Sequence, residues 1–300
     1  MNAKTKEPTY IIPMSVDMME KLRGLCIFTE LDLKNGYHHI EMVDESQKVL
    51  GFTRPNGKKC IMKRMCFGAK GAGPHFQKSV ERATEGVPIR GALCRYIDNL
   101  LVGSEYEEEH IKDVVALIQQ LTKWGFRLRM AKCKIGYRVI QFMGSMFDGK
   151  RRGLDKFKAS TFQKFKRPRS GKDVQSILGF ANFLRDFIPL YACVVGPLEK
   201  LRKCEKISDK MWRGEPERAF ETLKKLLSSP LVLHLPRWDL PFQIETDASQ
   251  YGVGGVLFQL VDGKKIAYVE FAAKVLRGGQ CNYPAVKREL LSGMFCFKKW

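Results

Sequence analysis

The chain has 300 residues, enough for two or three ordinary domains. Hydrophobic residues make up 44% and charged residues 28%, so a sizeable core can form, which argues against wholesale disorder. No apolar run reaches the ~18–20 residues that a bilayer-spanning helix needs. Because charges occur throughout residues 1–25, a secretory signal peptide is not expected either.

The positive charge is large and unevenly distributed. Lys and Arg number 52 against 32 Asp and Glu, a formal net charge of +20. Residues 150–172 carry ten Lys or Arg and one acid, and residues 54–70 carry six and no acid. Such density indicates a polyanionic partner such as nucleic acid, with an ordinary solvated basic surface as the alternative.

In the first half of the chain, apolar runs and turn signals predict strands or hairpins at 26–33, 51–65, 93–102 and 139–147. Helical patterns are found at 74–84 and 105–124. The second of these helices has apolar residues at three- and four-residue spacing: Ile111, Val114, Val115, Ile118 and Leu121.

In the second half, helices are predicted at 170–187, 217–227 and 283–300, and strands at 242–247, 252–260 and 266–271. A shift in composition near 205–240 predicts a linker before a small β-then-α domain. Nine cysteines are scattered without a C-x-x-C pair, which predicts a reducing, intracellular environment (cytoplasm or nucleus) and no structural zinc.

Two aspartates lie in apolar, strand-like surroundings. Asp32 is flanked by Leu31 and Leu33, and Asp98 follows Ile97. A carboxylate in such a setting is costly unless it is paired or bound to a metal. Two neighbouring strands of this kind would offer oxygen ligands to Mg²⁺. Taken alone, each aspartate is better explained as a turn or cap residue, so the hypothesis depends on their pairing.

Five motifs occur in order along the chain: FTELDLKNGYHHI (28–40), MCFG (65–68), YIDN (96–99), SILGFANF (176–183) with FIP (187–189), and FQIETDAS (242–249). Together they resemble motifs of reverse transcriptases from Ty3/gypsy-type long-terminal-repeat retrotransposons. In order, they are similar to the first palm motif, Met-Pro-Phe-Gly, the Tyr-x-Asp-Asp hairpin, the thumb signature and the start of an RNase H domain.

The resemblance implies an α+β right-hand polymerase with fingers, palm and thumb, followed by an incomplete RNase H-like α/β module. We expect fingers and palm at 1–148, without the N-terminal fingers strands, and thumb and connection at 149–211. The RNase H-like domain, truncated at its C-terminus, is expected at 212–300. The implied activity is RNA-directed DNA polymerase, with dNTPs, an RNA or DNA template with primer, and Mg²⁺ (or Mn²⁺) as cofactor.

The same resemblance assigns roles in the polymerase site. Asp32 and Asp98 would be metal-binding catalytic carboxylates. Tyr37 would be the steric gate that packs under the incoming sugar; without the motif, a core tyrosine would be the better explanation. Three further residues would contact the nucleotide: Leu33, Phe67 and Gly68.

Other assignments concern the nucleic acid. Met143 and Gly144 would lie in the hairpin that grips the primer end. Gln175, Gly179 and Phe183 are spaced four apart, so they share one helix face that suits a minor groove. An ordinary amphipathic helix is the alternative for that face.

In the C-terminal module, Asp247 and Glu289 match the first two carboxylates of an RNase H active site. They would hold a metal there, because that nuclease also uses two metals bound by carboxylates.

The chain departs from the family pattern in several places. Asn99 stands where the family has the second hairpin aspartate, which removes a negative charge beside the metal. Cys66 replaces a proline, and the following Ala-Pro becomes Gly73-Pro74. The shortened ends suggest a fragment or a decayed copy of a polyprotein. The alternatives are therefore a non-catalytic nucleic-acid-binding relic or a structural protein adopted by its host.

Overall fold

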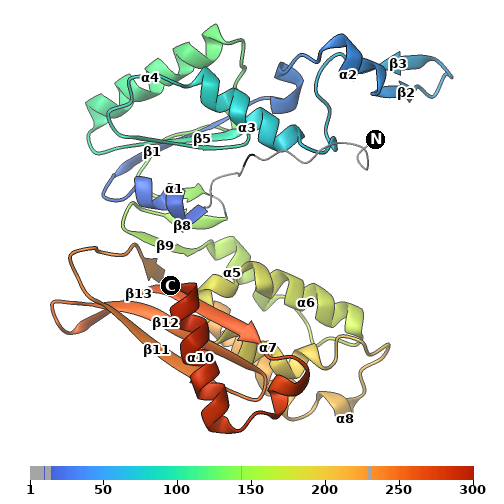
Figure 1. Cartoon of the computed structure of the whole chain (residues 1–300), viewed down its shortest axis with the longest axis vertical. Coiled ribbons are helices and arrows are strands. Elements are labelled where there is room, and N and C mark those ends of the chain that lie inside the picture. The colour runs from blue at the N-terminus through green and yellow to red at the C-terminus, as the bar shows by residue number, and fades with distance from the viewer. Residues whose placement is uncertain (1–9, 11–14, 143, 229–231) are drawn as a thin grey trace. The chain divides into compact units, whose positions relative to one another are not determined.

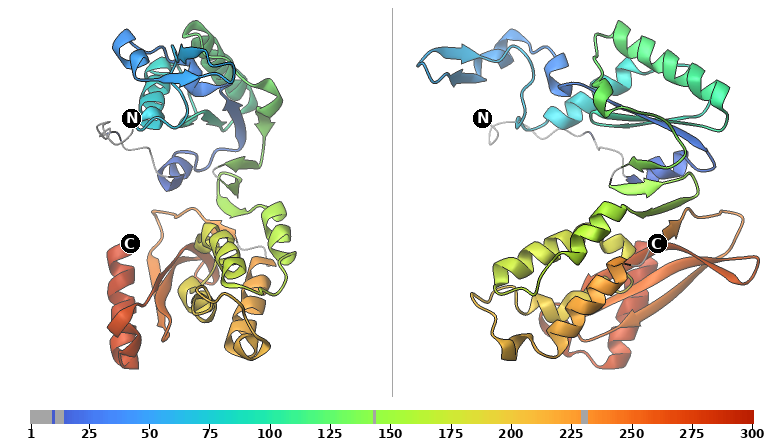
Figure 2. Two further views of the ribbon diagram at one scale, coloured as in Figure 1. Left: turned by 90° about the vertical axis from the view of Figure 1, so that its right-hand side faces the viewer. Right: turned by 180° about the vertical axis from the view of Figure 1, so that it is seen from behind.

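A computed structural model describes residues 10, 15–142, 144–228 and 232–300 (Figures 1 and 2). The chain folds as two units, which divide between Ile140 and Gln141 and are described separately below. Within the described residues, no helix is long and apolar enough to cross a membrane.

The first unit is built on a four-stranded antiparallel sheet in the order β4-β5-β1-β6. Its elements, in chain order, are α1 Ser15–Lys21, β1 Ile27–Asp32, η2 Gly36–His39, α2 Asp44–Lys48, β2 Gly51–Thr53, β3 Lys59–Ile61, α3 Ala72–Ala83, β4 Ala92–Tyr96, β5 Asn99–Ser104, α4 Glu107–Lys123, η3 Met130–Lys132 and β6 Lys134–Tyr137. The strands and helices predicted for this half are confirmed, with α1, α2, β6 and the two short 3₁₀ helices in addition.

Helices α3 and α4 pack on one face of this sheet, and α1 packs on the other. Leu31 and Leu100 share a core with Phe76 of α3 and Leu117 of α4. On the opposite face, the Cys94 thiol contacts the carbonyl oxygen of Met18 in α1. The sheet is thus buried on both sides, and its strand ends carry the site described below.

The face of α4 that packs on the sheet differs from the apolar stripe seen in the sequence. Val114, Leu117 and Leu121 are buried, but Ile111 and Val115 are exposed. The helix is rotated because it also buries two polar residues, His110 and Asp113, which bond to each other through Ser104 and so satisfy their polar atoms.

The second unit contains two antiparallel sheets, in the orders β10-β9-β8-β7 and β11-β12-β13. Its elements are β7 Ile140–Phe142, β8 Ser145–Phe147, β9 Arg151–Leu154, α5 Lys156–Gln163, α6 Gly171–Phe183, η4 Arg185–Phe187, α7 Tyr191–Glu199, α8 Asp209–Trp212, α9 Glu215–Ser228, β10 Val232–His234, β11 Phe242–Ala248, β12 Gly252–Val261, β13 Lys265–Val275, η5 Gly278–Asn282 and α10 Ala285–Lys299.

Helices α7 and α10 cover opposite faces of the three-stranded sheet (Figure 1). A Cβ added at Gly252 would lie 2.5 Å from the Cβ of Ala192 in α7, and one added at Gly255 would lie 2.7 Å from the Cys296 sulfur in α10. Both glycines are needed for this close approach. Because α7 packs directly on β12 and β13, the helices and this sheet form one body.

The segment 205–240 is not a linker, so that prediction was wrong. Helix α9 lies within it, and its buried Phe220, Leu223 and Leu227 belong to the same core as α6 and α7. The shift in composition reflects the charged outer face of α9, whereas its inner face packs fully.

Candidate active site and nucleic-acid interface

The structure brings Asp32 and Asp98 to the same end of the first sheet. Strands β1 and β5 pair antiparallel with Asp32 opposite Asn99, and Asp98 lies in the turn just before β5. The Leu33 N–H donates to the Asp98 carbonyl oxygen at 2.9 Å. Both aspartates line one cavity of about 470 Å³. The predicted pairing of the two strands is thus present.

The cavity also contains three of the four residues predicted to meet the nucleotide. Leu33, Tyr37 and Phe67 line its wall, and Phe67 is 64% exposed. Gly68 does not line it but follows Phe67 with a positive φ of 82°. A flat, accessible aromatic side chain beside two carboxylates gives this cavity both apolar and charged surfaces.

Tyr37 is held by aromatic contacts and lies close to Asp98. Its ring centroid is 5.0 Å from that of Phe67 and 5.2 Å from that of Phe76. Burial raises the pKa of Tyr37, and the negative charge of Asp98 raises it further, so the hydroxyl stays protonated. Gly36 permits this packing, because a Cβ there would lie 2.7 Å from the Phe76 ring.

Two cations in the cavity were not predicted from the sequence. The Arg129 N–H donates to the Asp32 carbonyl oxygen at 2.8 Å, and its side-chain Nε lies 4.0 Å from the Asp32 carboxylate. Lys132 lies one turn further on and also lines the cavity. The available signal was the basic run after the second predicted helix, Arg127, Arg129 and Lys132.

Asn99 lies beside Asp32 but does not line the cavity among the described residues. Directly paired residues of antiparallel strands project to the same face, so the Asn99 amide is next to the Asp32 carboxylate. An aspartate at position 99 would therefore add its charge beside Asp32.

In the second unit, the three predicted groove-facing residues of α6 share one accessible face. Gln175, Gly179 and Phe183 are all exposed, whereas Val174, Leu178 and others on the opposite side are buried. A Cβ added at Gly179 would meet nothing within 4 Å. The helix begins with a capping box between Ser170 and Asp173, which fixes where this face starts.

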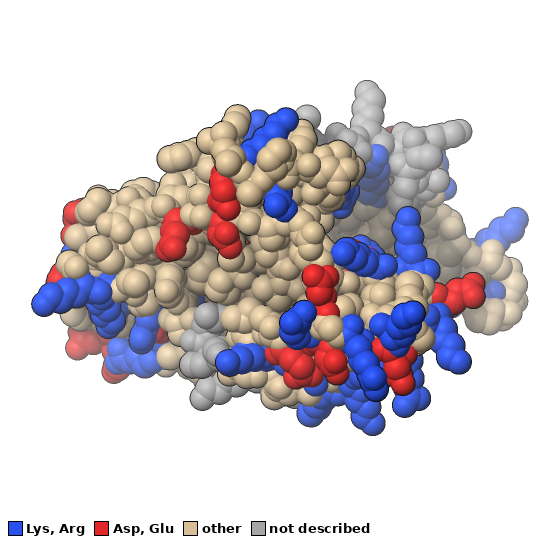
Figure 3. Space-filling model, turned by 90° about the horizontal axis from the view of Figure 1, so that it is seen from below, with Lys and Arg blue, Asp and Glu red and all other residues tan. Residues whose placement is uncertain are grey.

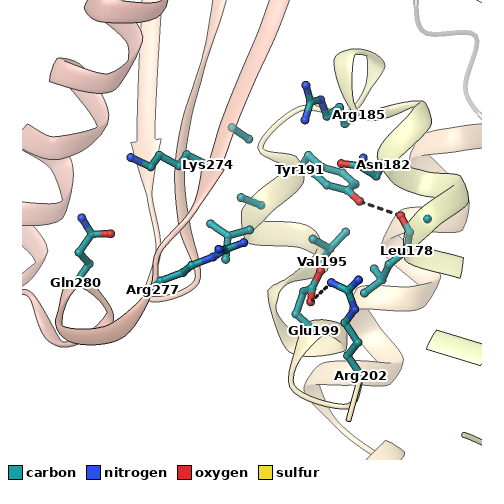
Figure 4. A pocket seen from close by; sticks show the side chains of 14 residues that line it. Leu178, Asn182, Arg185, Tyr191, Val195, Glu199, Arg202, Lys274, Arg277 and Gln280 are labelled. Carbon is teal, nitrogen blue, oxygen red and sulfur yellow. Dashed lines mark hydrogen bonds and ion pairs between the residues drawn. The ribbon is translucent and has the colours of Figure 1, made fainter. Parts of the chain in front are cut away.

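A basic cavity of about 540 Å³ adjoins this face and is shown in Figure 4. Gly179 and Asn182 of α6 line it, and the Arg277 side chain extends towards α7 whereas Lys274 points away. No ion pair of Arg277 occurs within the part of the chain that the structure describes. The cavity also receives Arg185 and Arg202, of which Arg202 pairs with Glu199 at 3.4 Å.

The basic cluster 150–172 is only partly available to a partner. Arg152 is buried with its guanidinium 5.5 Å from the Phe187 ring centroid, and Arg167 pairs with Asp209 at 2.6 Å. Elsewhere on the surface, the face seen in Figure 3 carries many Lys and Arg side chains, with acidic residues between them. Part of the basic cluster thus supports the fold.

The predicted primer-contacting hairpin corresponds to β7 and β8. Gly144 lies in the turn between them with a positive φ of 84°, a conformation that glycine adopts without strain. Met143 lies outside the described residues.

Asp247 and Glu289 lie on β11 and α10, with both side chains exposed. Ser292 of α10 donates to the Asp247 carbonyl oxygen at 2.9 Å, which ties the helix to the strand end. Burial raises the pKa of the Cys193 thiol, and the charges of Asp247 and Glu289 act in the same direction. Elsewhere along the described chain too, no group of three or more His, Cys, Asp or Glu is placed to hold a metal.

The architecture is that of a right-hand polymerase followed by an RNase H-like module. The family model described as "Reverse transcriptase (RNA-dependent DNA polymerase)" matches residues 2–147, and that described as "RNase H-like domain found in reverse transcriptase" matches residues 212–300. The chain belongs to the reverse transcriptase family, and its relatives place it with retrotransposon polyproteins of the Ty3/gypsy type, as the motifs predicted.

Two relatives and two solved structures illustrate the likeness. The Transposon Tf2-7 and Tf2-3 polyproteins of Schizosaccharomyces pombe are 31% and 30% identical over 307 residues, which cover 100% of this chain and 22% of each relative. The chain thus spans about a fifth of their length. Foamy viral protease-reverse transcriptase structures superpose with TM-scores of 0.84 (dRH, with ds DNA; 21% identity, 99% of this chain and 51% of that one) and 0.83 (with RNA/DNA hybrid; 22%, 99% and 40%). These structures confirm the predicted fold class.

Proposed function

We propose that this chain is the RNA-directed DNA polymerase part of a retroelement polyprotein and extends a primer on an RNA or DNA template. The observation that carries the proposal is the cavity at the end of the first sheet, where Asp32 and Asp98 lie with Leu33, Tyr37 and Phe67. Carboxylates, an aromatic gate and an exposed ring in one cavity match the needs of a bound deoxynucleotide. The nine free cysteines fit a location inside the cell.

The donor set of the cavity fits Mg²⁺, with Mn²⁺ as an alternative. Mg²⁺ takes one or two protein carboxylates and completes its coordination with water and substrate phosphates. Asp32 and Asp98 supply two such carboxylates, and Asn99 adds an amide beside Asp32. When bound, the metal would supply charge stabilisation for phosphoryl transfer.

Different side chains of the cavity would contact different parts of the nucleotide. Tyr37 would lie under the sugar and exclude a 2′-hydroxyl, and Phe67 would offer its exposed ring to the nucleotide. Arg129 would attract the triphosphate, because a guanidinium binds phosphate oxygens in a forked geometry. Leu33 would shape the wall, and Gly68 would set the backbone next to Phe67; neither contributes charge.

The exposed face of α6 and the basic cavity beside it would hold the template–primer. Gln175, Gly179 and Phe183 would track the groove, and Arg277 would contact a backbone phosphate. The primer end would meet the hairpin of Met143 and Gly144. The similar foamy viral structures are complexes with ds DNA and with RNA/DNA hybrid, which supports this partner class.

In the RNase H-like module, Asp247 and Glu289 would be the two carboxylates of a second metal site. Along the chain, residues 1–148 would form the fingers and palm, 149–211 the thumb and connection, and 212–300 the RNase H-like domain. Because α7 packs on β12 and β13, the last two parts would move together.

Primer extension by the purified chain tests the proposal, with Mg²⁺ and Mn²⁺ in parallel. We expect extension that Asp98→Asn abolishes. Asp262→Asn is the matched control, because Asp262 is also an exposed aspartate in a hairpin turn, between β12 and β13. Equal extension by the parent and Asp98→Asn would contradict the proposal.

A second candidate function, a nucleic-acid-binding relic, is favoured by Asn99, which removes a charge from the metal site. Binding to a labelled template–primer between 50 and 200 mM salt distinguishes the two. Affinity that falls by about 10³ over this range, as six or more phosphate contacts predict, without any extension would support the relic.

A further inference from the structure

We propose that Gln77 is a positioning residue for the polymerase site: it holds the turn that carries Asp98 so that the carboxylate faces the cavity. Gln77 lies on α3, outside every sequence motif described above. The inference rests on the proposed function, in which Asp98 binds a metal.

The turn that carries Asp98 has an unfavourable backbone. Tyr96 pairs with Asn99, which leaves Ile97 and Asp98 as a two-residue turn between β4 and β5. Ile97 has a φ of +54°, a region that β-branched residues rarely enter. Turns with positive φ at this position usually carry Gly, Asn or Asp. Without outside support, the isoleucine would favour another turn conformation, and Asp98 would move with it.

Gln77 supplies that support from three hydrogen bonds. Its side-chain oxygen accepts from the Ile97 N–H at 2.6 Å. Its amide nitrogen donates to the Arg95 carbonyl oxygen at 3.0 Å and to the Glu81 carboxylate at 2.9 Å. The side chain is 0% exposed, so no water competes for these bonds. Gln77 therefore contacts the hairpin on its β4 arm and at its turn.

A second anchor lies on the opposite side of the turn. The Leu33 N–H donates to the Asp98 carbonyl oxygen, which fixes the turn to the strand of Asp32. The Ile97 N–H and the Asp98 carbonyl are thus both held, one by α3 and one by β1. Strained backbone at functional sites persists where the surroundings over-determine it in this way.

Helix α3 links the turn to the rest of the cavity. Phe76, the residue before Gln77, contacts the Tyr37 ring, and its own ring packs closely against Gly36. A purely structural role for position 77 would need only an apolar side chain, since its neighbours Phe76 and Val80 are buried in the core. The buried Gln77 amide is instead explained by its hydrogen bonds to Ile97 and Arg95 in the hairpin.

The test compares Gln77→Met with Gln259→Met in the full chain. Methionine keeps the length of glutamine but neither accepts nor donates these bonds. Gln259 is a matched control: it is 2% exposed and makes three hydrogen bonds, to Arg237 and Leu240 in the other unit. The probe is Mn²⁺ alone, titrated by electron paramagnetic resonance, and Asp98→Asn identifies the binding that depends on Asp98.

We expect Gln77→Met to weaken the Asp98-dependent Mn²⁺ binding about tenfold, a typical loss for a residue that orients a metal ligand. Gln259→Met should lower thermal stability without changing Mn²⁺ binding. In an Ile97→Gly background the turn no longer disfavours its conformation, so Gln77→Met should cost about two- to threefold at most.

Hydrogen exchange of the 95–100 segment gives a readout that needs no metal. Exchange there should be faster in Gln77→Met and unchanged in Gln259→Met. Unchanged exchange, or unchanged Mn²⁺ affinity in Gln77→Met beside a parent that binds, would overturn the inference. A parent without Asp98-dependent Mn²⁺ binding would instead refute the proposed function, and exchange would still decide whether Gln77 holds the turn.

Discussion

The two pairs of candidate catalytic carboxylates differ in how much of a site surrounds them. Asp32 has a side chain that is 16% exposed, lies 4.0 Å from Arg129, and shares a cavity with Asp98 and an aromatic wall. Asp247 and Glu289 are both exposed on the second unit. Asp98 is exposed too, but it lines a cavity with groups that suit a nucleotide, whereas Asp247 and Glu289 lie on an open surface.

This difference shows how a partly buried acid within a lined cavity, Asp32, differs from acids on an open surface. A partly desolvated carboxylate requires a counter-charge, so Asp32 depends on a cation. A solvated carboxylate has no such requirement, and the Asp247 carboxylate accepts a bond from its own neighbour, the Ala248 N–H, at 2.8 Å. We therefore expect the first pair to dominate the chemistry of this chain.

Neutralising one acid of each pair tests most directly whether the first pair dominates the chemistry. Asp32→Asn should lower primer extension by about 10³ or more, because a charge beside developing phosphoryl charge contributes several kcal/mol to the barrier. Asp247→Asn should leave the rate of extension unchanged. Single-turnover extension with saturating template–primer measures both. Equal losses in the two variants would show that the pairs act together and that the comparison is wrong.

Asn99→Asp should strengthen the first site. The amide lies opposite Asp32, and replacing it by a carboxylate adds one negative charge with almost no change in shape. We expect extension to rise at least tenfold, which corresponds to about 1.4 kcal/mol of barrier. A template–primer binding assay serves as the control and should be unaffected. If extension stays the same while binding is normal, the altered segment at Cys66 becomes the better explanation for weak activity.

Much of the fold could be predicted from the sequence, because strands such as β1 and β12 carry local apolar and turn signals. Asp32, Asp98 and Asp247 were found because each lies in a recognisable motif. Arg277 and Gln77 were not, since each acts through a contact made by a distant segment. Helix α4 shows the same limit: the apolar stripe predicted Ile111 and Val115 to be inside, but tertiary packing buried another face.

A smaller effect is expected from the basic cavity of the second unit. Arg277→Ala should weaken template–primer binding several-fold at 100 mM salt and reduce the steepness of its salt dependence by about one contact, because one phosphate partner is lost. Lys274→Ala removes an equal charge from the rim of the same cavity, where the side chain points away from α7, so it should have less effect. Binding curves at three salt concentrations measure this. Matching losses in both variants would indicate a diffuse basic surface.

The smallest expected effect concerns how the stability of the first unit depends on pH. The His110 ring is buried, with Nε2 2.7 Å from the Thr29 hydroxyl and Nδ1 2.9 Å from the Ser104 hydroxyl. Since Ser104 donates to Asp113, the His110 Nδ1–H donates to the Ser104 hydroxyl oxygen, and in neutral histidine Nε2 accepts from the Thr29 hydroxyl.

Burial lowers the pKa of His110, although Asp113 acts in the opposite direction. The folded state therefore binds this proton less readily than the unfolded state. The stability that neutral His110 contributes is full above the unfolded pKa of about 6.5 and is lost as pH falls below it.

We expect the free energy of unfolding of the first unit to decrease between pH 7 and 5, with a slope of up to about 1.4 kcal/mol per pH unit from this group. Urea unfolding, followed by hydrogen exchange of peptides from the first unit, measures it. His110→Gln should flatten the slope, and His75→Gln, at an exposed position of the same unit, should preserve it. A slope that survives in His110→Gln would assign the acid sensitivity to His39, whose pKa burial also lowers.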